Sequence, residues 1–362
     1  MLLFLGGEAL VRAAAALARR AGLSSLVVGL TVVSAMTSAP ELAVTLDALA
    51  RSQLDLAVGN IVGSNIANVL LVVGLAAALT GLTVQRQLLR LDLPFLLALS
   101  LLLFLLASDG RLGRIDAAIL LGCLLVHTVV TLRAGRGDAA TGPQDGSGGQ
   151  DPAAEPTVPV LSLPAAASLL LLGVGLLVAG SSALVTGAVG LATAFGVSGL
   201  VVGLTVVAVG TSTPELVATI VAVRRGEPDI ALGNAVGSNI FNLGFILGVP
   251  ALIAGEGIPV PAAALALDIP LMVAAAVAIA PAAFTGMRLA RWEGVMFVTL
   301  YAAYLGYVAL DAQEHDALEG YSAVMAGFVL PLAGVAVLTS VWYEVRRLRA
   351  RPHSAPATGP HR

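Results

Sequence analysis

Apolar runs separated by short polar breaks extend along nearly the whole chain. Many of these runs reach the roughly 20 mainly apolar residues that are needed to cross a bilayer. Because backbone polar groups inside lipid need internal partners, runs of this length predict helices. We expect helices at roughly 2–18, 23–50, 55–79, 90–107, 113–132, 162–190, 197–222, 228–254, 262–284, 292–310 and 321–343.

One long polar stretch interrupts this pattern. Residues 134–160 are rich in Gly, Pro, Ala and Asp, a composition typical of a disordered linker, which we expect in the cytoplasm. The linker separates a first unit, 1–133, from a second unit, 161–310. The remaining residues, 311–362, are expected to form one extra transmembrane helix and a basic cytoplasmic tail.

The two units contain a repeated sequence. Residues 29–74 align with 203–248 at a constant offset of 174, without a gap and with more than half of the positions identical. Since each unit has five predicted helices, an odd number, the second copy enters the membrane from the opposite side. The sequence therefore predicts an all-α integral membrane protein, with two inverted five-helix repeats (ten core transmembrane helices) and one extra C-terminal helix. Pro164–Ala179 has no counterpart before Met1, so we expect translation to start further upstream.

Composition supports a membrane location. Only 11% of the residues are charged, against about 25% in soluble proteins, and the mean hydropathy is +0.95. The single Cys123 excludes an internal disulfide framework. No catalytic base–nucleophile set and no Cys/His metal cluster is evident, so we expect neither enzyme activity nor a cofactor. The expected partners are the lipid bilayer and small inorganic cations, without nucleic acid or an obligate protein partner.

The arginines predict an orientation in the cell (inner) membrane, because cytoplasmic loops are enriched in basic residues. The richer side of the predicted layout carries Arg12, Arg19, Arg20, Arg86, Arg90, Arg133, Arg136, Arg224, Arg225, Arg288, Arg291 and the tail group Arg346, Arg347, Arg349 and Arg351. The opposite side carries mainly Arg51, Arg111 and Arg114. We therefore predict an outside N-terminus and a cytoplasmic C-terminus.

Two glutamates inside apolar helices are the main candidate site residues. Glu41 and Glu215 occupy equivalent positions in the two copies, and each follows a proline. A carboxylate near the bilayer centre costs several kcal/mol, so by default it indicates function rather than packing. The alternative is a structural carboxyl paired with an arginine, but no basic residue is near either glutamate in sequence.

The preceding prolines are expected to break these helices. Proline lacks an amide donor and clashes with the preceding turn, which frees carbonyls near Ser34–Thr37 and Ala208–Thr211. Carbonyls beside a carboxylate and hydroxyls provide the oxygen ligands that calcium prefers, and sodium accepts the same ligands. A plain helix kink would explain the proline but not the glutamate.

A second motif, GNxVGSNIxN, follows in both copies. Gly63 and Gly237 are expected to permit close helix approach. Serine and asparagine four residues apart share a helical face in both copies, as Ser64 with Asn68 and as Ser238 with Asn242. With Ser38 and Ser212, one turn before the glutamates, they could complete a polar cage. Interhelical hydrogen bonding alone is the simpler role, and we assign it to Asn60, Asn65, Asn234 and Asn239.

Three polar residues outside these motifs are given ordinary structural roles. Asp92 and Asp268, in LDLP and LDIP, are interpreted as helix-start caps. His127, alone in an apolar helix, is interpreted as a packed neutral side chain.

Together the motifs resemble those of the calcium/cation antiporter superfamily, in its sodium/calcium exchanger group. The resemblance is carried by GLTVVSAMTSAPEL (29–42) with GNIVGSNIAN (59–68), and by their second copies GLTVVAVGTSTPEL (203–216) and GNAVGSNIFN (233–242). It implies calcium ligation by Glu41, Glu215 and the carbonyls of Thr37 and Thr211. It implies sodium ligation by Ser38, Ser64, Ser212, Ser238 and the carbonyls of Ser34 and Ala208, with Asn68 and Asn242 lining the middle of the cage.

The resemblance implies a secondary active antiporter that exchanges calcium for sodium by alternating access. This sequence departs from the family pattern in having Met36 in place of the glycine of the first GTS, and Asn242 where some members have Asp. Protons or potassium are therefore alternative transported ions, and proton/calcium antiport through the same site is the second interpretation. A passive cation channel is the third, and broken helices in inverted repeats favour a transporter over it.

Overall fold

The computed structural model describes residues 1–51, 54–141, 161–194, 208–311 and 317–350, and helices dominate all of these segments. The first unit contains α1 (Leu2–Ala21), α2 (Ser25–Val28), η1 (Gly29–Val33), α3 (Ser34–Thr37), α4 (Ala39–Ala50), α5 (Leu54–Ala67), η2 (Asn68–Val73), α6 (Gly74–Thr80), β1 (Leu82–Thr83), η3 (Leu88–Asp92), α7 (Leu93–Leu106), η4 (Ala107–Asp109), β2 (Arg111–Leu112) and α8 (Arg114–Thr141).

The second unit repeats this order of elements. It contains α9 (Leu163–Ala194), α11 (Ala208–Thr211), α12 (Thr213–Arg224), α13 (Pro228–Phe241), η6 (Asn242–Ile246), α14 (Gly248–Ile253), β3 (Ile258–Pro259), η7 (Ala264–Asp268), α15 (Ile269–Phe284), η8 (Thr285–Met287), β4 (Arg288–Leu289) and α16 (Arg291–Asp311). The C-terminal segment adds α17 (Ala317–Val324), η9 (Met325–Val329) and α18 (Leu330–Ala350).

The helices lie close to the predicted runs, because long apolar segments leave the backbone no other way to satisfy its hydrogen bonds in lipid. α8 continues to Thr141, past the expected linker boundary at 133, and residues 142–160 of the expected linker lie outside the described residues. Residues 195–207, which begin the expected helix 197–222, also lie outside them.

The chain is a multi-spanning helical membrane protein. Its described part has eight helices that are long and apolar enough to cross a membrane, or nine if the bent pair Ser25–Thr37 and Ala39–Ala50 forms one span. α1 contains Glu8 and three arginines, and is too charged to be counted among them by composition. The apolar side chains exposed on α8, α9 and α18 fit a lipid-facing surface.

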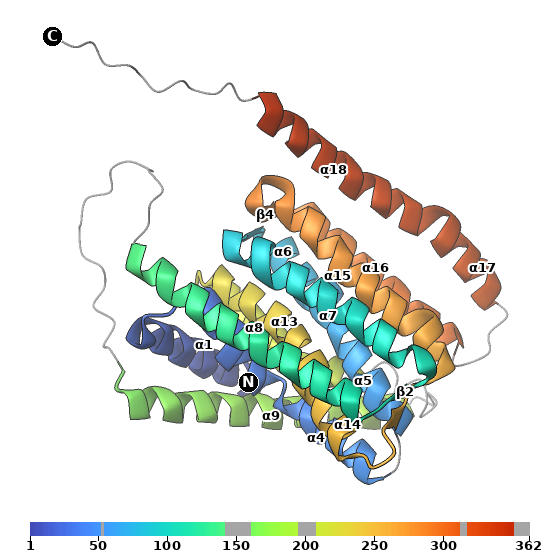
Figure 1. The fold of residues 1–362 in the computed structure, drawn as a ribbon, viewed down its shortest axis with the longest axis horizontal. Coiled ribbons are helices and arrows are strands. Elements are labelled where there is room, and N and C mark those ends of the chain that lie inside the picture. The colour runs from blue at the N-terminus through green and yellow to red at the C-terminus, as the bar shows by residue number, and fades with distance from the viewer. Residues whose placement is uncertain (52–53, 142–160, 195–207, 312–316, 351–362) are drawn as a thin grey trace.

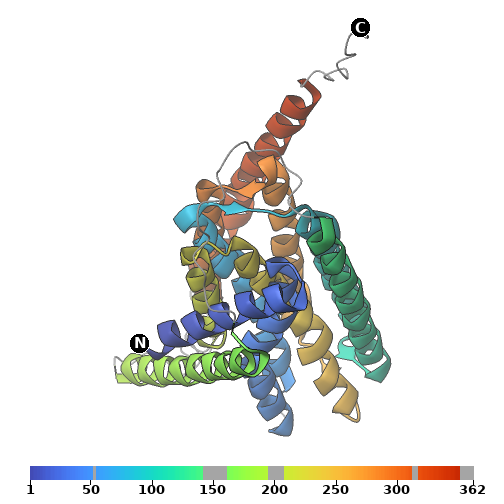
Figure 2. The same ribbon diagram turned by 90° about the vertical axis from the view of Figure 1, so that its left-hand side faces the viewer.

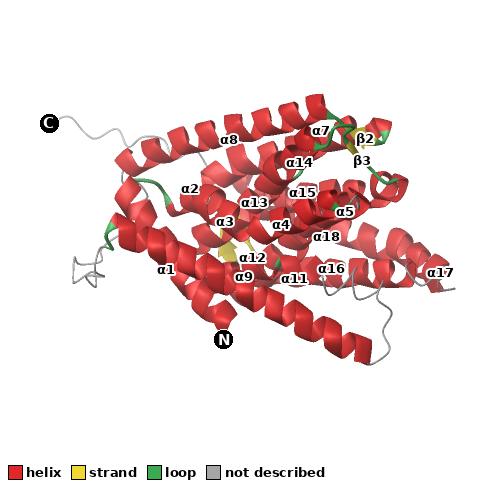
Figure 3. Ribbon diagram, turned by 90° about the horizontal axis from the view of Figure 1, so that it is seen from below, coloured by secondary structure: helices red, strands yellow, loops and turns green. Residues whose placement is uncertain are grey.

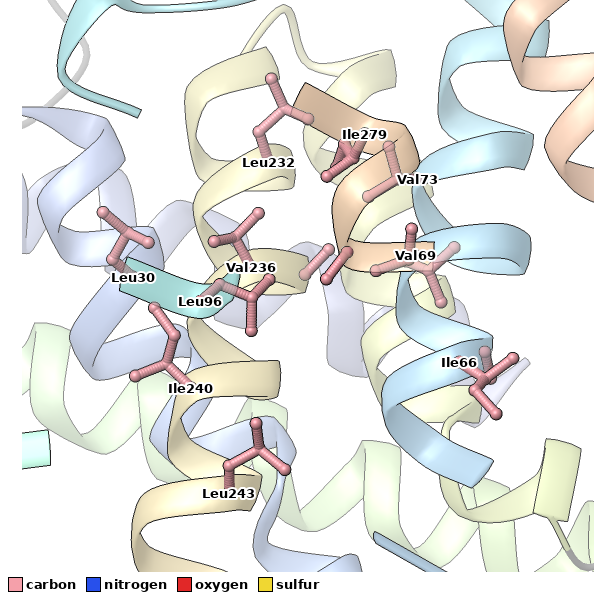
Figure 4. Close-up of a cluster of buried hydrophobic side chains, with 14 of the residues drawn as sticks. Leu30, Ile66, Val69, Val73, Leu96, Leu232, Val236, Ile240, Leu243 and Ile279 are labelled. Atoms are coloured by element: carbon pink, nitrogen blue, oxygen red, sulfur yellow. The ribbon is translucent and has the colours of Figure 1, made fainter. Parts of the chain in front are cut away.

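The two repeats are arranged around a buried centre. The spans Ala57–Thr80 and Pro228–Ile253 are 78% and 72% buried inside the protein, whereas Arg114–Gly135 is only 22% buried. α5 and α13 lie inside, α1 runs alongside α9 at one edge, and α8 and α18 lie on the outside (Figures 1, 2 and 3). Figure 4 shows apolar side chains of η1, α5, η2, α7, α13 and α15 meeting in this core.

Short strand pairs join the halves crosswise. β1 pairs antiparallel with β4 through Leu82 and Leu289, and β2 pairs antiparallel with β3 through Leu112 and Ile258. β1 and β3 hold equivalent places in the two units, as do β2 and β4, so the two ladders are equivalent contacts. The halves are therefore related by an approximate two-fold axis.

Glycines allow α13 to pack directly on the first broken helix. A Cβ at Gly237 would lie 2.5 Å from the Leu30 carbonyl oxygen, and one at Gly233 would lie 2.6 Å from that of Leu26. The expected close approach at Gly237 is therefore present. By the repeat offset, the equivalent approach of Gly63 would involve residues 203–204, which lie outside the described residues.

Candidate cation site

Both copies of the TSxPE motif break a helix at the same point. α3 ends at Thr37, Ser38 leaves helical geometry with ψ of 9°, and α4 begins next to Pro40, giving a bend of 41° between the two segments. In the second copy, Ser212 has ψ of 6° between α11 and α12. Each glutamate therefore lies in the first turn after a break, as the prolines predicted.

The two glutamates lie in one hydrogen-bonded cluster at the interface of the repeats. Both are fully buried. The Ser38 hydroxyl donates to Glu215 Oε1 across the interface at 3.2 Å, and Ser64 donates to Glu41 Oε1 at 3.3 Å. The Ser212 hydroxyl contacts that of Ser64 at 3.1 Å. The two carboxylates are close enough for their charges to interact.

Threonines and asparagines fix the broken helices around this cluster. The Thr37 hydroxyl donates to Asn234 Oδ1 at 2.9 Å and lies 3.4 Å from the Ser238 hydroxyl. The Asn234 amide then donates to the Glu215 carbonyl at 3.3 Å. The second copy repeats this arrangement less tightly, with the Thr211 hydroxyl 3.5 Å from Asn60 Oδ1.

Several oxygens of the cluster have no hydrogen-bond donor. Within the described residues, Glu41 Oε2, Glu215 Oε2, Asn68 Oδ1 and Asn242 Oδ1 are buried and have no partner. Buried polar atoms are nearly always hydrogen-bonded, so each of these exceptions needs an explanation. Carboxylate and amide oxygens are ligands of hard cations such as calcium.

Within the described segments, no positive side chain is paired with either glutamate. The ion pairs in the described part of the chain are Arg51–Asp47, His127–Asp92 and Arg225–Glu8, and none involves Glu41 or Glu215. A structural pairing of these glutamates with an arginine is therefore not seen, and the cluster has the charge and the oxygens to hold cations.

Some predicted site residues do not belong to this hydrogen-bonded cluster. Ser34 donates its hydroxyl to the Leu30 carbonyl at 2.8 Å, and its own carbonyl accepts the Ser38 amide at 3.0 Å. Asn68 is buried, but neither polar atom of its amide has a hydrogen bond to any residue that the structure describes. Ala208 begins α11, and its side chain lies outside the described set. The carbonyl of Gly210, which Pro214 leaves without an amide partner, accepts the Ser181 hydroxyl from α9.

Sequence reasoning missed one recurring partner of the glutamates. The Thr45 hydroxyl donates to the Glu41 carbonyl at 2.7 Å, and the Asn60 amide lies 3.4 Å from the Thr45 hydroxyl. Thr219 receives the equivalent amide of Asn234 at 3.1 Å. The available signal was a threonine four residues after the glutamate in both copies.

The interpretation of Asp92 and Asp268 as helix caps was wrong. Neither side chain bonds the first turn of its helix. Asp92 accepts instead from His127 Nε2 at 2.9 Å, and Asp268 accepts from the Tyr304 hydroxyl at 3.2 Å. For each aspartate, a side-chain donor on a neighbouring helix competes with the amides of the aspartate's own helix for the carboxylate. His127 is buried as predicted, but it is paired rather than alone.

Comparison with known proteins gives a consistent result over most of the chain. The family model described as sodium/calcium exchanger protein matches residues 1–133 and 165–310. The inner membrane protein YrbG of Escherichia coli is 38% identical over 265 residues, which cover 70% of this chain and 77% of YrbG. The sodium/calcium exchanger MaX1 of Methanosarcina acetivorans is 31% identical over 330 residues, which cover 83% of this chain and 93% of MaX1.

The fold has a solved counterpart. The structure of the sodium-calcium exchanger NCX_Mj, soaked with sodium and calcium, superposes with a TM-score of 0.70 at 27% sequence identity. The superposition covers 84% of this chain and 94% of that exchanger.

Proposed function

The chain belongs to the sodium/calcium exchanger protein family, and we propose that it exchanges calcium for sodium across the membrane as a secondary active antiporter. The observation that carries the proposal is the pair of buried glutamates, Glu41 and Glu215. Among the residues that the structure describes, their Oε2 atoms have no hydrogen-bond donor and their charges have no basic partner. A transported cation would coordinate these oxygens and neutralise these charges. The same coordination chemistry favours ion transport over catalysis.

Charge explains why such a site exchanges ions rather than leaking them. Without a cation, the site holds up to two negative charges in a medium of low dielectric constant, and carrying these across the bilayer is costly. One calcium ion, or two monovalent cations, neutralises them. Calcium and sodium compete for the same oxygens, so they exclude each other. The loaded protein can then alternate its access, while the empty protein cannot.

We assign calcium to the two glutamates and the carbonyls of Thr37 and Thr211. We assign sodium to the hydroxyls of Ser38, Ser64, Ser212 and Ser238 and the carbonyls of Ser34 and Ala208, with Asn68 and Asn242 between the ions. The hydrogen bonds from Ser38 and Ser64 to the glutamates support this grouping, since a hydroxyl that touches a carboxylate can share its cation.

We further propose that the protein lies in the inner membrane with an outside N-terminus and a cytoplasmic C-terminus. The asymmetric distribution of arginines supports this orientation. A reporter enzyme that works only in the cytoplasm should be active when fused to the C-terminus. A reporter that works only outside the cytoplasm should be inactive there.

Calcium flux into proteoliposomes tests the proposed function. With calcium outside, an outward sodium gradient should drive uptake in wild-type protein, whereas Glu41→Gln and Glu215→Gln should abolish it because one carboxylate cannot neutralise calcium. Calcium uptake driven by a proton gradient in place of the sodium gradient would instead favour proton/calcium exchange through the same site. Uptake without any counter-ion would indicate a channel. Near-normal exchange by both variants would remove the glutamates from the mechanism.

A further inference from the structure

Two asparagines each join the two repeats beside the candidate cation site. Asn60 of α5 and Asn234 of α13 hold equivalent places in the repeated GNxVGSNIxN motif. Asn234 is fully buried and Asn60 is partly buried. The amide nitrogen of each contacts the glutamate-bearing helix of its own repeat, and the amide oxygen contacts the threonine hydroxyl before the break in the other repeat. Neither asparagine is among the residues to which we assign an ion.

Asn234 contacts two residues that we assign to calcium. Its amide donates to the Glu215 carbonyl at 3.3 Å and to the Thr219 hydroxyl at 3.1 Å, both on α12. Its Oδ1 accepts the Thr37 hydroxyl of α3 at 2.9 Å. The carboxylate of Glu215 and the carbonyl of Thr37 are proposed calcium ligands from different repeats. A single side chain therefore holds the backbones of these two ligand residues at a fixed separation.

Asn60 makes the equivalent contacts at longer distances. Its amide lies 3.5 Å from the Glu41 carbonyl and 3.4 Å from the Thr45 hydroxyl, and its Oδ1 lies 3.5 Å from the Thr211 hydroxyl. The Thr45 hydroxyl donates to the Glu41 carbonyl at 2.7 Å, so this carbonyl has a closer donor than Asn60. Hydrogen bonds from nitrogen to oxygen are usually about 2.7–3.2 Å long. The link through Asn60 is therefore the weaker of the two.

Asn239 makes a comparable link that does not reach a proposed ion ligand. It lies on α13, like Asn234, and is 2% exposed. Its amide donates to the Asn65 carbonyl of the other repeat at 3.2 Å. Asn234 and Asn239 therefore share a helix, a degree of burial and a type of bond between the repeats. They differ in whether that bond involves residues that we assign to calcium.

We propose that Asn234, and to a lesser degree Asn60, are positioning residues that set the affinity for calcium without contacting the ion. Calcium ligands from two repeats must meet within a narrow range, because calcium–oxygen distances lie between about 2.3 and 2.6 Å. Asn234 holds the Thr37 segment against the first turn of α12 before the ion binds, so less of the binding free energy is used to order the ligands. The inference rests on the calcium ligation in the proposed function.

Calorimetric titration of the purified protein in detergent with calcium chloride tests this role, because it measures affinity without transport. Asn234→Ala should weaken calcium binding about tenfold, equivalent to about 1.4 kcal/mol, and Asn60→Ala should weaken it no more than about threefold. Asn239→Ala is the matched control. It removes an equally buried amide of the same helix, yet should leave calcium affinity unchanged. Equal calcium affinities of Asn234→Ala and Asn239→Ala overturn the proposal.

Substitutions of Thr37 test the hydrogen bond itself. Thr37→Val keeps the proposed carbonyl ligand and the shape of the side chain, but removes the hydroxyl that Asn234 accepts. It should weaken calcium binding about tenfold, whereas Thr37→Ser, which keeps the hydroxyl, should bind nearly as the wild-type protein does. Because both residues act through one bond, combining Thr37→Val with Asn234→Ala should be no worse than Asn234→Ala alone. Effects that multiply in the double variant overturn the proposal.

Exchange assays on the same variants separate this inference from the proposed function. If wild-type protein binds and exchanges calcium, and Asn234→Ala and Thr37→Val bind it equally tightly, the positioning role fails and the proposed function stands. If calcium binding follows the expected order but sodium does not drive calcium flux, the positioning role stands and sodium/calcium exchange fails. Wild-type protein that does not bind calcium overturns both.

Discussion

Asn65 and Asn239 bind each other's backbone across the centre of the molecule. The Asn65 amide donates to the Asn239 carbonyl at 3.3 Å, and the Asn239 amide donates to the Asn65 carbonyl at 3.2 Å. The two residues occupy the same position of the repeated GSN motif. An exchange of this kind requires that the approximate two-fold axis pass between them. The pair therefore holds α5 and α13 in the register that brings both glutamates to one site.

The Asn65–Asn239 exchange predicts a loss of stability in Asn239→Ala. Removing this amide deletes one of the two hydrogen bonds that the pair makes between α5 and α13, which should cost about 1 kcal/mol of unfolding free energy. Thermal unfolding in detergent would measure this loss, and calcium affinity should be retained. Asn65→Ala is the informative partner variant, because Asn65 Oδ1 also accepts from the Asn242 amide at 3.0 Å. It should raise KM for calcium as well, and equal effects of the two variants on KM would contradict the assignment.

Local sequence signals predicted the helices and their breaks well. Apolar runs, the proline before each glutamate and the internal repeat are all short-range features, and the structure places its helices and both breaks accordingly. The interhelical hydrogen bonding predicted for Asn65 and Asn239 is also present. The membership of the exchanger family, predicted from the paired motifs, is confirmed by the comparisons.

The sequence signals could not predict which side chains on neighbouring helices form hydrogen bonds with each other. Ser38 precedes Glu41 by one turn, yet its hydroxyl donates to Glu215 of the other half. Asp92 precedes a helix and looked like a cap, yet it binds His127, which is 35 residues away. Spacing along one helix specifies which side chains share a face but not which neighbouring helix that face meets. Such pairings depend on the packing of the whole membrane domain.

The contact between Ser38 and Glu215 predicts an effect on ion preference. Ser38→Ala removes a hydroxyl that we assign to sodium, so the sodium concentration for half-maximal exchange should rise about tenfold, equivalent to about 1.4 kcal/mol. The calcium constant should change less. Ser34→Ala is the matched control, because the Ser34 hydroxyl donates to its own helix and only the carbonyl is assigned to the site. Equal shifts for the two ions in Ser38→Ala would argue against the assignment.

The packing of α13 predicts that Gly237 does not tolerate a side chain. In Gly237→Ala, the new Cβ would meet the Leu30 carbonyl oxygen at 2.5 Å, and backbone cannot move aside as a flexible side chain would. Overpacking of this kind costs about 1–3 kcal/mol, so the folded yield and the melting temperature should both fall. Gly122→Ala on the exposed face of α8 should leave both unchanged or slightly raised, since alanine favours helix. Unaltered stability of Gly237→Ala would show that the two segments are further apart.

The amide of Asn242 predicts how a third acid would act in the site. Asn242 donates to the Ser64 hydroxyl at 3.2 Å and to Asn65 Oδ1 at 3.0 Å. An ionised aspartate in its place can only accept, so it would oppose Asn65 Oδ1 and add a third negative charge that one calcium ion does not neutralise. Protonation restores the donor and removes that charge. Asn242→Asp should therefore exchange calcium faster at pH 6 than at pH 8.

Asn242→Ala, which loses the donor without gaining a charge, should be slow at every pH. A rate for Asn242→Asp that is independent of pH would mean that position 242 lies too far from the two glutamates to affect their charge balance.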